Sequence, residues 1–274
     1  YGAKGRKALS DQVPRKTKDI SMDLSEYRKN DSEQQRTEDL MQHITRISGD
    51  GKSALDIGAR DGHFSILLTE FFDKVTALDL LKPNISSSRI TCVQGDITNL
   101  DFDDNTFDLV FCAEVLEHIP PHLLEKAASE LSRVTREFLL IGVPYKQDIR
   151  IGRTTCSSCG GKGPPWGHVN SFDENELISL FPLLTTNKVT FVGETDARTN
   201  FMSVFFMDIA GNPYGTYNQE EKCIHCGKKL KSPPERTLFQ KIFTRVAFHL
   251  KNLQKPFNRP HPNWIHILFH KTKV

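Results

Sequence analysis

Hydrophobic and polar positions fall into short alternating blocks along most of the chain. Five short apolar runs have the length expected of buried strands: 53–57, 74–80, 90–93, 107–112 and 138–143. Apolar residues recur at helical spacing in three further segments: 32–47, 63–72 and 121–135. Strands that alternate with helices of this length indicate βαβ units and a largely parallel sheet, so the predicted fold class is α/β.

Two later apolar runs, at 189–193 and 202–209, flank the polar segment Asp-Ala-Arg-Thr-Asn. Only a few residues separate them, and strands joined by so short a connection pair antiparallel. We therefore expect these two runs to close the sheet as an antiparallel pair.

Composition is that of a folded, water-exposed protein. Of the 274 residues, 38% are hydrophobic and 26% are charged, which excludes a disordered chain and a small disulfide-rich secreted protein. No segment approaches the roughly 18–20 uninterrupted apolar residues that a membrane-spanning helix needs. We expect a cytoplasmic protein.

Charge is distributed unevenly although the net charge is only +2. Residues 1–30 carry 8 Lys and Arg against 4 Asp and Glu, and residues 222–274 carry 12 against 1. The segment between them is correspondingly acidic. A basic tail on an acidic body indicates either an anionic partner or a tail that folds back on the body.

The six cysteines fall into two classes. Cys92 and Cys112 lie in apolar runs and are expected in the core. The others form two Cys-x-x-Cys pairs that are each followed by Gly: Cys156 with Cys159, and Cys223 with Cys226. Two such pairs predict a structural Cys₄ zinc site, with a redox pair as the alternative.

Four motifs at the ends of predicted strands carry candidate binding residues. The segment 55–64, Leu-Asp-Ile-Gly-Ala-Arg-Asp-Gly-His-Phe, ends a strand and opens a helix, and its glycines let the backbone approach a ligand. Asp79 ends the next strand, where a carboxylate can bind ribose hydroxyls. Asp96 follows the third strand, and Ala113-Glu114 follows the fourth.

Taken together, these motifs resemble the class I S-adenosylmethionine-dependent methyltransferases, most closely the type 11 methyltransferase domain, over residues 35–210. The resemblance implies a Rossmann-like seven-stranded sheet with one antiparallel strand, and S-adenosylmethionine bound at the carboxyl ends of the first strands. It implies these cofactor-binding residues: Asp56, Gly58, Arg60, Gly62, Asp79, Leu80, Asp96, Ile97, Ala113 and Glu114. Arg60 stands where the family often has a glycine.

Two histidines are candidate catalytic residues. Methyl transfer is an in-line displacement in which the enzyme mainly positions donor and acceptor. A hydroxyl acceptor also benefits from a general base with a pKa near 7, which is usually histidine. His118 directly follows the fourth predicted strand, and His168 lies in a polar loop after the first Cys pair. For His118, a hydrogen-bonded loop residue is the alternative interpretation.

The C-terminal segment 236–254 places apolar residues on one helical face, with Lys and Arg beside them. Such a helix can lie on an anionic membrane surface or pack on the methyltransferase body. Basic residues interleaved with aromatic residues also fit a nucleic-acid surface.

The predicted organisation is a basic arm and a methyltransferase domain with one inserted zinc knuckle, then a second knuckle and a basic amphipathic extension. The arm spans 1–30, and the domain spans 31–210 with its knuckle at 150–165. The second knuckle spans 211–232 and the extension 233–274. We expect S-adenosylmethionine-dependent methyl transfer to a hydroxyl of a saccharide or lipid-linked small molecule. The alternatives are an RNA methyltransferase and a non-catalytic cofactor-binding module.

Overall fold

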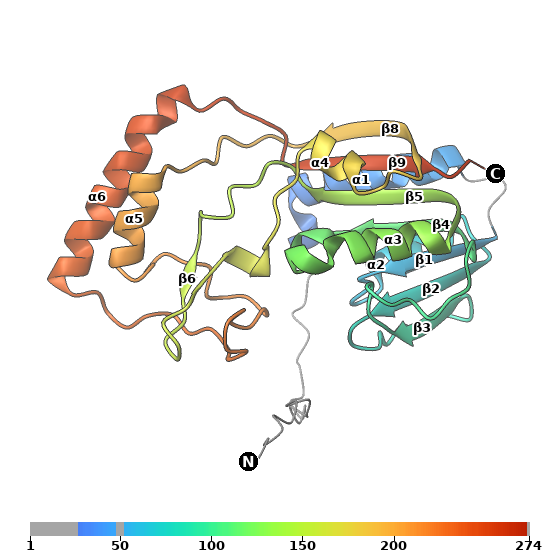
Figure 1. The fold of residues 1–274 in the computed structure, drawn as a ribbon, viewed down its shortest axis with the longest axis horizontal. Coiled ribbons are helices and arrows are strands. Elements are labelled where there is room, and N and C mark those ends of the chain that lie inside the picture. The colour runs from blue at the N-terminus through green and yellow to red at the C-terminus, as the bar shows by residue number, and fades with distance from the viewer. Residues whose placement is uncertain (1–26, 48–51, 273–274) are drawn as a thin grey trace, which may run out of the picture.

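The computed structural model describes residues 27–47 and 52–272. Most of the predicted basic arm, 1–30, lies outside these residues. The described part contains a seven-stranded sheet in the order β3-β2-β1-β4-β5-β9-β8 (Figure 1). Its strands are β1 (Ser53–Ile57), β2 (Lys74–Asp79), β3 (Ile90–Gln94), β4 (Phe107–Ala113), β5 (Thr135–Pro144), β8 (Thr185–Val192) and β9 (Trp264–His270).

The sheet is parallel from β3 to β5, and β9 runs antiparallel between β5 and β8. This arrangement confirms the expected Rossmann-like methyltransferase fold with one antiparallel strand. β1 lies between β2 and β4, so the strand order in the sheet changes direction at β1. The carboxyl ends of these strands form the edge of the sheet where α/β proteins bind ligands.

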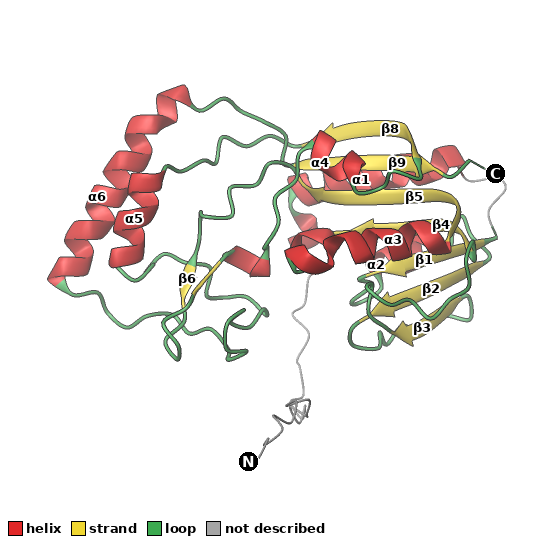
Figure 2. Ribbon diagram, in the orientation of Figure 1, coloured by secondary structure: helices red, strands yellow, loops and turns green. Residues whose placement is uncertain are grey.

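Helices cover both faces of the sheet (Figure 2). On one face, α3 (Leu124–Val134) and α4 (Glu174–Ser179) bury apolar side chains such as Leu131 and Leu177. On the other, α1 (Asp31–Ile47) and α2 (His63–Leu68) bury Leu40 and Leu68. Short 3₁₀ turns complete the connections at Tyr27–Lys29, Leu116–His118, Pro121–Leu123, Pro165–Gly167 and Lys255–Phe257.

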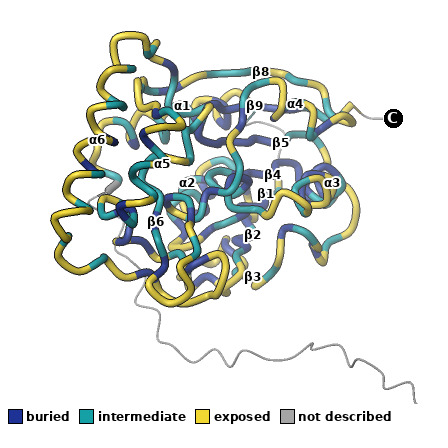
Figure 3. The backbone as a smooth tube through the Cα atoms, turned by 60° about the vertical axis from the view of Figure 1, so that its left-hand side comes forward, coloured by how far each residue is buried: buried dark blue, intermediate teal, exposed yellow. Residues whose placement is uncertain are grey.

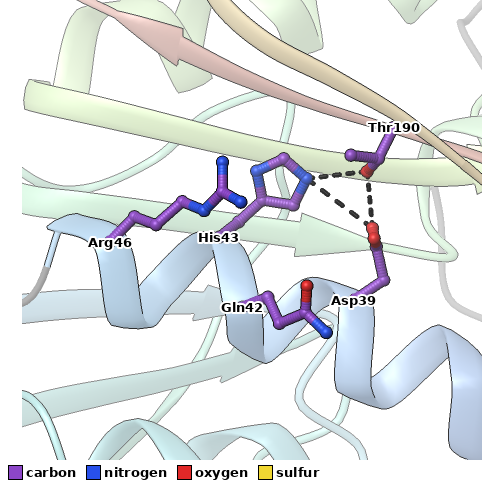
Figure 4. A pocket seen from close by; sticks show the side chains of 5 residues that line it. All are labelled: Asp39, Gln42, His43, Arg46 and Thr190. Atoms are coloured by element: carbon purple, nitrogen blue, oxygen red, sulfur yellow. Dashed lines mark hydrogen bonds and ion pairs between the residues drawn. The ribbon is translucent and has the colours of Figure 1, made fainter.

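A polar network fixes α1 to the antiparallel strands (Figure 4). Asp39 Oδ2 accepts hydrogen bonds from His266 Nδ1 at 2.6 Å and from Thr190 Oγ1 at 2.5 Å. The Thr190 hydroxyl also lies 2.7 Å from His43 Nε2. Burial alone would raise the pKa of Asp39, but the hydrogen bonds to His266, His43 and Thr190 lower it well below the usual value. The carboxylate therefore stays ionised.

The expected strand at 202–209 is wrong. This segment forms α5 (Phe201–Ile209). Asn200 is its N-cap residue, and the Asn200 side chain accepts a hydrogen bond from Ser203 N at 2.8 Å. A short apolar run fits a buried strand or a helix equally well, and here the N-cap decides for the helix. The antiparallel partner of β8 is β9, in the segment 233–274 that the sequence analysis treated as an extension.

The residues between β8 and β9, 193–263, form a helical insertion that lies to one side of the sheet (Figure 1). In it, α6 (Leu238–Gln254) packs against α5. Ser203 Oγ donates to the carbonyl oxygen of Ala247, and the rings of Phe206 and Phe243 stack at 5.7 Å. Of the alternatives given for this helix, the described residues show packing on the predicted methyltransferase segment 31–210, because α5 lies within it.

The side of α6 that faces α5 carries Phe243 and two small residues. Thr244 and Ala247 are its only buried members among the described residues, so most of the helix surface remains exposed (Figure 3). No helix in the described ranges is long and apolar enough to cross a membrane.

Candidate functional site

The loop between β1 and α2 has the tight path expected of a ligand-binding turn. Gly58 N donates to Leu78 O at 2.8 Å, which ties the loop to the end of β2. Gly58 and Gly62 adopt positive φ angles of 77° and 86°, and a Cβ on Gly62 would collide with the side chain of Ile85. Both positions therefore require glycine.

Arg60 lies in the middle of this loop, where the family resemblance implies a glycine. Its φ of 44° is in the left-handed region, which is uncommon for a residue with a side chain. Its backbone N–H donates to Asp79 Oδ2 at 3.0 Å. The loop is thus joined to the carboxylate that the sequence analysis assigned to the ribose.

The acidic residues at or near the carboxyl ends of the first three strands differ in their surroundings. Asp56 is buried, accepts a 2.5 Å hydrogen bond from Ser65 Oγ, and has its pKa raised to about 7 by burial. Asp79 lies at the end of β2, beside Leu80, whose side chain is 62% exposed. Asp96 accepts hydrogen bonds from the backbone and hydroxyl of Thr98.

The remaining predicted cofactor residues lie at the same edge. Ile97 is buried after β3, and Ala113 ends β4. Glu114 follows with a φ of 58°, and its Oε1 is 3.5 Å from Arg36 Nη1. Burial raises the pKa of Glu114, although Arg36 opposes the shift.

Two ion pairs that the sequence analysis missed connect distant segments to this loop. Arg28 Nη2 contacts both carboxylate oxygens of Asp61 at 2.7 Å. Arg60 Nη2 contacts Glu220 Oε2 at 2.7 Å. The first partner comes from before α1 and the second from the helical insertion. No local pattern marks either pair, because each depends on the folded arrangement of the chain.

The four paired cysteines meet in one cluster, as predicted. Their Sγ atoms lie within 4.8 Å of one another, and the pairs Cys156–Cys226 and Cys159–Cys223 are each 3.7 Å apart. A tetrahedron with Zn–S bonds near 2.3 Å has edges of about 3.8 Å. Two of the separations match these edges, so the four thiols have the number, type and proximity of ligands for a zinc ion.

Each Cys pair forms the same knuckle. Gly160 N donates to Cys156 O and Gly227 N donates to Cys223 O, both at 2.8 Å. These glycines have φ angles of 70° and 68°, as a tight turn requires. The first knuckle lies between two short strands, β6 (Thr154–Thr155) and β7 (Lys162–Gly163). The cluster thus joins the segment after β5 to the helical insertion.

The structure brings the two predicted catalytic histidines together. Their rings are edge to face with centroids 4.6 Å apart. His168 is held there because Val169 N donates to Glu117 O at 2.8 Å, and because Asn170 Nδ2 donates to the carbonyl oxygens of Leu116 and Ile119. The loop that carries His168 is therefore attached to the end of β4.

The histidines do not have the pKa expected of a general base. Burial lowers the pKa of His118 to about 4 and that of His168 to about 3. Both imidazoles are neutral at pH 7, but they hold a proton less strongly than a base with a pKa near 7.

A polar cleft of about 680 Å³ opens beside His168. Gln147 belongs to its lining, and Gln147 Oε1 lies 2.6 Å from His168 Nδ1. Other lining residues carry charges of both signs: Asp148, Arg150, Asp173, Glu176 and Arg198. A cleft of this size and polarity suits a hydrophilic small molecule.

Comparison with known proteins identifies the domain around these motifs. Residues 55–138 match the family model described as "Methyltransferase domain". The chain carries a methyltransferase domain. The matched residues run from β1 into β5 and include the binding loop, the acidic series and His118, whereas the four paired cysteines and His168 lie beyond them.

Solved structures share the fold of the methyltransferase domain. The N-methyltransferase NodS from Bradyrhizobium japonicum WM9, solved with S-adenosylhomocysteine, has a TM-score of 0.51 and 21% identity, covering 63% of this chain and 85% of its own. The YcgJ protein of Bacillus subtilis has a TM-score of 0.51 and 14% identity, and the match covers 87% of this chain and 100% of YcgJ. The [4+2]-cyclase SpnF has a TM-score of 0.50 and 15% identity, and the match covers 88% of this chain and 81% of SpnF. No curated protein matches the chain.

Proposed function

We propose that the protein transfers a methyl group from S-adenosylmethionine to a hydroxyl of a saccharide or a lipid-linked small molecule. The observation that carries the proposal is the binding edge at β1, β2 and β4, where the Gly58–Gly62 loop is joined to Asp79 by a 3.0 Å hydrogen bond. Asp79 would hold the ribose, while Asp96 and Ile97 would border the adenine. S-adenosylmethionine supplies an electrophilic methyl group on a sulfonium.

The charge at this edge favours a cationic ligand. A nicotinamide dinucleotide places its pyrophosphate at the start of the first helix. Here Asp61 precedes α2 and is ionised, since its hydrogen bond and ion pair with Arg28 lower its pKa despite burial. This carboxylate opposes a pyrophosphate and is compatible with a sulfonium.

A hydroxyl acceptor is favoured by the groups next to the polar cleft. The cleft offers hydrogen-bonding side chains for a saccharide, and its Gln147 contacts His168. The neutral His118 and His168 would surround the hydroxyl as it loses its proton. Zinc at the cysteine cluster would have a structural role, because it would fix the loop that carries His168.

A lipid-linked acceptor is favoured by the outer faces of α5 and α6. Most of the large apolar side chains exposed on these helices recur at three-, four- or seven-residue spacing and so share one face of each helix, whereas the exposed Phe248 lies on another side of α6. The side chains that share these faces are Phe201, Met202, Phe205 and Ile209 on α5, and Leu238, Phe239, Ile242, Val246 and Leu253 on α6. Lys241 and Arg245 border the α6 face, and α6 contains no acidic residue. This combination is typical of helices that bind anionic membranes.

Radiolabel transfer tests the proposal. Purified protein and methyl-labelled S-adenosylmethionine would be incubated with a fractionated cell extract, and label would be counted in lipid–glycan, small-molecule, RNA and protein pools. We expect label in the lipid–glycan or small-molecule pool. Label confined to RNA would establish the RNA methyltransferase alternative instead. Absence of S-adenosylhomocysteine binding in calorimetry would remove the proposal altogether.

A further inference from the structure

A second group of potential metal ligands lies beside the cofactor edge. One ligand atom from each of Glu117, His118 and His168 lies within 4.8 Å of the other two. Glu117 and His118 belong to the 3₁₀ turn Leu116–His118 after β4, and His168 comes from the loop after the first knuckle. These residues are separate from the four cysteines, so they form a distinct cluster.

The side chain of Glu117 is the most unusual member. It is only 1% exposed, yet neither carboxylate oxygen has a hydrogen-bonding partner among the residues that the structure describes. Burial of an unpaired carboxylate is costly. The backbone of Glu117 is fixed because its carbonyl oxygen accepts hydrogen bonds from the N–H groups of Val169 and Asn170. A cation between the carboxylate and the two imidazoles would supply the missing partner.

His168 is already oriented as a ligand. Its Nδ1 lies 2.6 Å from Gln147 Oε1, and because an amide oxygen only accepts hydrogen bonds, Nδ1 carries the proton and Nε2 keeps its lone pair. Histidine ligands of metals usually donate their second ring N–H in this way.

We propose that Glu117, His118 and His168 bind one divalent transition-metal ion. Two imidazoles and one carboxylate suit ions such as Mn²⁺, Fe²⁺, Co²⁺ and Zn²⁺, whereas Mg²⁺ and Ca²⁺ prefer oxygen ligands throughout. Three protein ligands leave coordination positions for an exogenous oxygen.

The role of this ion rests on the proposed function. An acceptor hydroxyl bound to the metal becomes more acidic and releases its proton to water. Its oxygen then forms a bond to the methyl carbon, and the carbon–sulfur bond breaks with its electron pair remaining on sulfur. The metal would thus take the place of a general base.

Co²⁺ is the probe for the site. Protein with zinc already bound at the cysteines would be titrated with Co²⁺ by calorimetry and visible spectroscopy. We expect one Co²⁺ per chain with weak d–d bands and no intense sulfur-to-metal band, since no thiolate belongs to the cluster. Glu117→Gln and His168→Ala should each weaken Co²⁺ binding at least tenfold. The matched controls, Glu125→Gln and His122→Ala, change exposed side chains nearby and should bind as the wild type does.

Several results would overturn the metal site. These are no Co²⁺ binding to the zinc-loaded wild type, a spectrum of thiolate type only, or unchanged binding by Glu117→Gln. The wild-type spectrum decides the question even if a variant fails to fold. Co²⁺ binding without S-adenosylhomocysteine binding would support the metal site and refute the proposed function. Methyl transfer that continues unchanged after Co²⁺ and other metals are removed from this site would refute the role in the reaction.

Discussion

The imidazole rings of His118 and His168 meet edge to face with centroids 4.6 Å apart. His118 comes from the 3₁₀ turn after β4, inside the matched methyltransferase domain, and His168 comes from a loop outside it, next to the cysteine cluster. This contact joins the edge that carries the predicted cofactor residues to the segment beyond the matched residues 55–138. The two predicted catalytic histidines therefore come from both parts of the chain.

Asp79→Asn should weaken S-adenosylhomocysteine binding by roughly one to two orders of magnitude, because hydrogen bonds to a charged group contribute about 1.5–3 kcal/mol. The variant also weakens the hydrogen bond that Arg60 N donates. Isothermal calorimetry measures the change. Asp101→Asn, which alters an exposed carboxylate, is the control, and equal affinities of the two variants would contradict the assignment.

Metal analysis of protein purified without chelators should find zinc bound at the cysteines, and Cys223→Ser should lose it. The variant should also unfold at a lower temperature, since structural zinc contributes directly to folding. Cys92→Ala removes a thiol outside the cluster and should retain the zinc content of the wild type. A Cys223→Ser variant with undiminished zinc would rule out the Cys₄ site.

Asp39→Asn should lower the free energy of unfolding by about 2–3 kcal/mol, because it replaces a carboxylate that accepts hydrogen bonds from His266 and Thr190. Urea denaturation measures the loss. Gln42→Ala, on the exposed side of the same helix, should change stability by less than about 0.5 kcal/mol. Similar losses in both variants would show that the network contributes little.

Asp56 predicts an unusual pH dependence of stability. Burial raises its pKa to about 7 in the folded protein, above the ordinary 3.8. The folded state therefore holds a proton that the unfolded state has released between these values, so this group's contribution falls as pH rises from about 4 to 7. Asp56→Asn should remove the fall. Parallel pH profiles of wild type and variant in urea denaturation would contradict the raised pKa.

Lys241→Glu combined with Arg245→Glu should reduce binding to vesicles that contain anionic lipids, because each basic residue near such a surface contributes about 1 kcal/mol. Vesicle co-sedimentation measures the loss. The control, Lys74→Glu with Lys126→Glu, makes the same charge change at exposed positions on β2 and α3. Equal losses in both double variants would indicate only a general charge effect, and the outer face of α6 would then not be a membrane site.

The parallel strands and their binding loop were predictable because the information is local. Each of the first four strands is a largely apolar run that ends at or just before a glycine or an acidic residue, as at Gly58 and Asp79. The cysteine cluster was predictable from spacing alone. By contrast, β9 was not recognised. Its seven residues, from Trp264 to His270, come after a basic helix near the end of the chain. They pair with β5 and β8, which are distant in the sequence.

The cluster of Glu117, His118 and His168 was only partly predictable. The Glu117–His118 pair after a strand is visible in the sequence, and His168 stands out in its polar loop. Their proximity depends on the hydrogen bonds of Val169 and Asn170 to the turn after β4. The unpartnered carboxylate of Glu117 appears only when burial is known. Contacts of this kind have no counterpart in spacing or composition.

The pairing of β8 with β9 places the whole helical insertion between two neighbouring strands. Thr195 and His261 exchange backbone hydrogen bonds of 2.8 and 2.9 Å just beyond the ends of these strands, so the insertion leaves and rejoins the sheet at one point. Topologically, α5, the second knuckle and α6 are the loop of a single β-hairpin. A loop of this kind can be lengthened, shortened or exchanged without altering the order of the strands, and so can the surface that it presents.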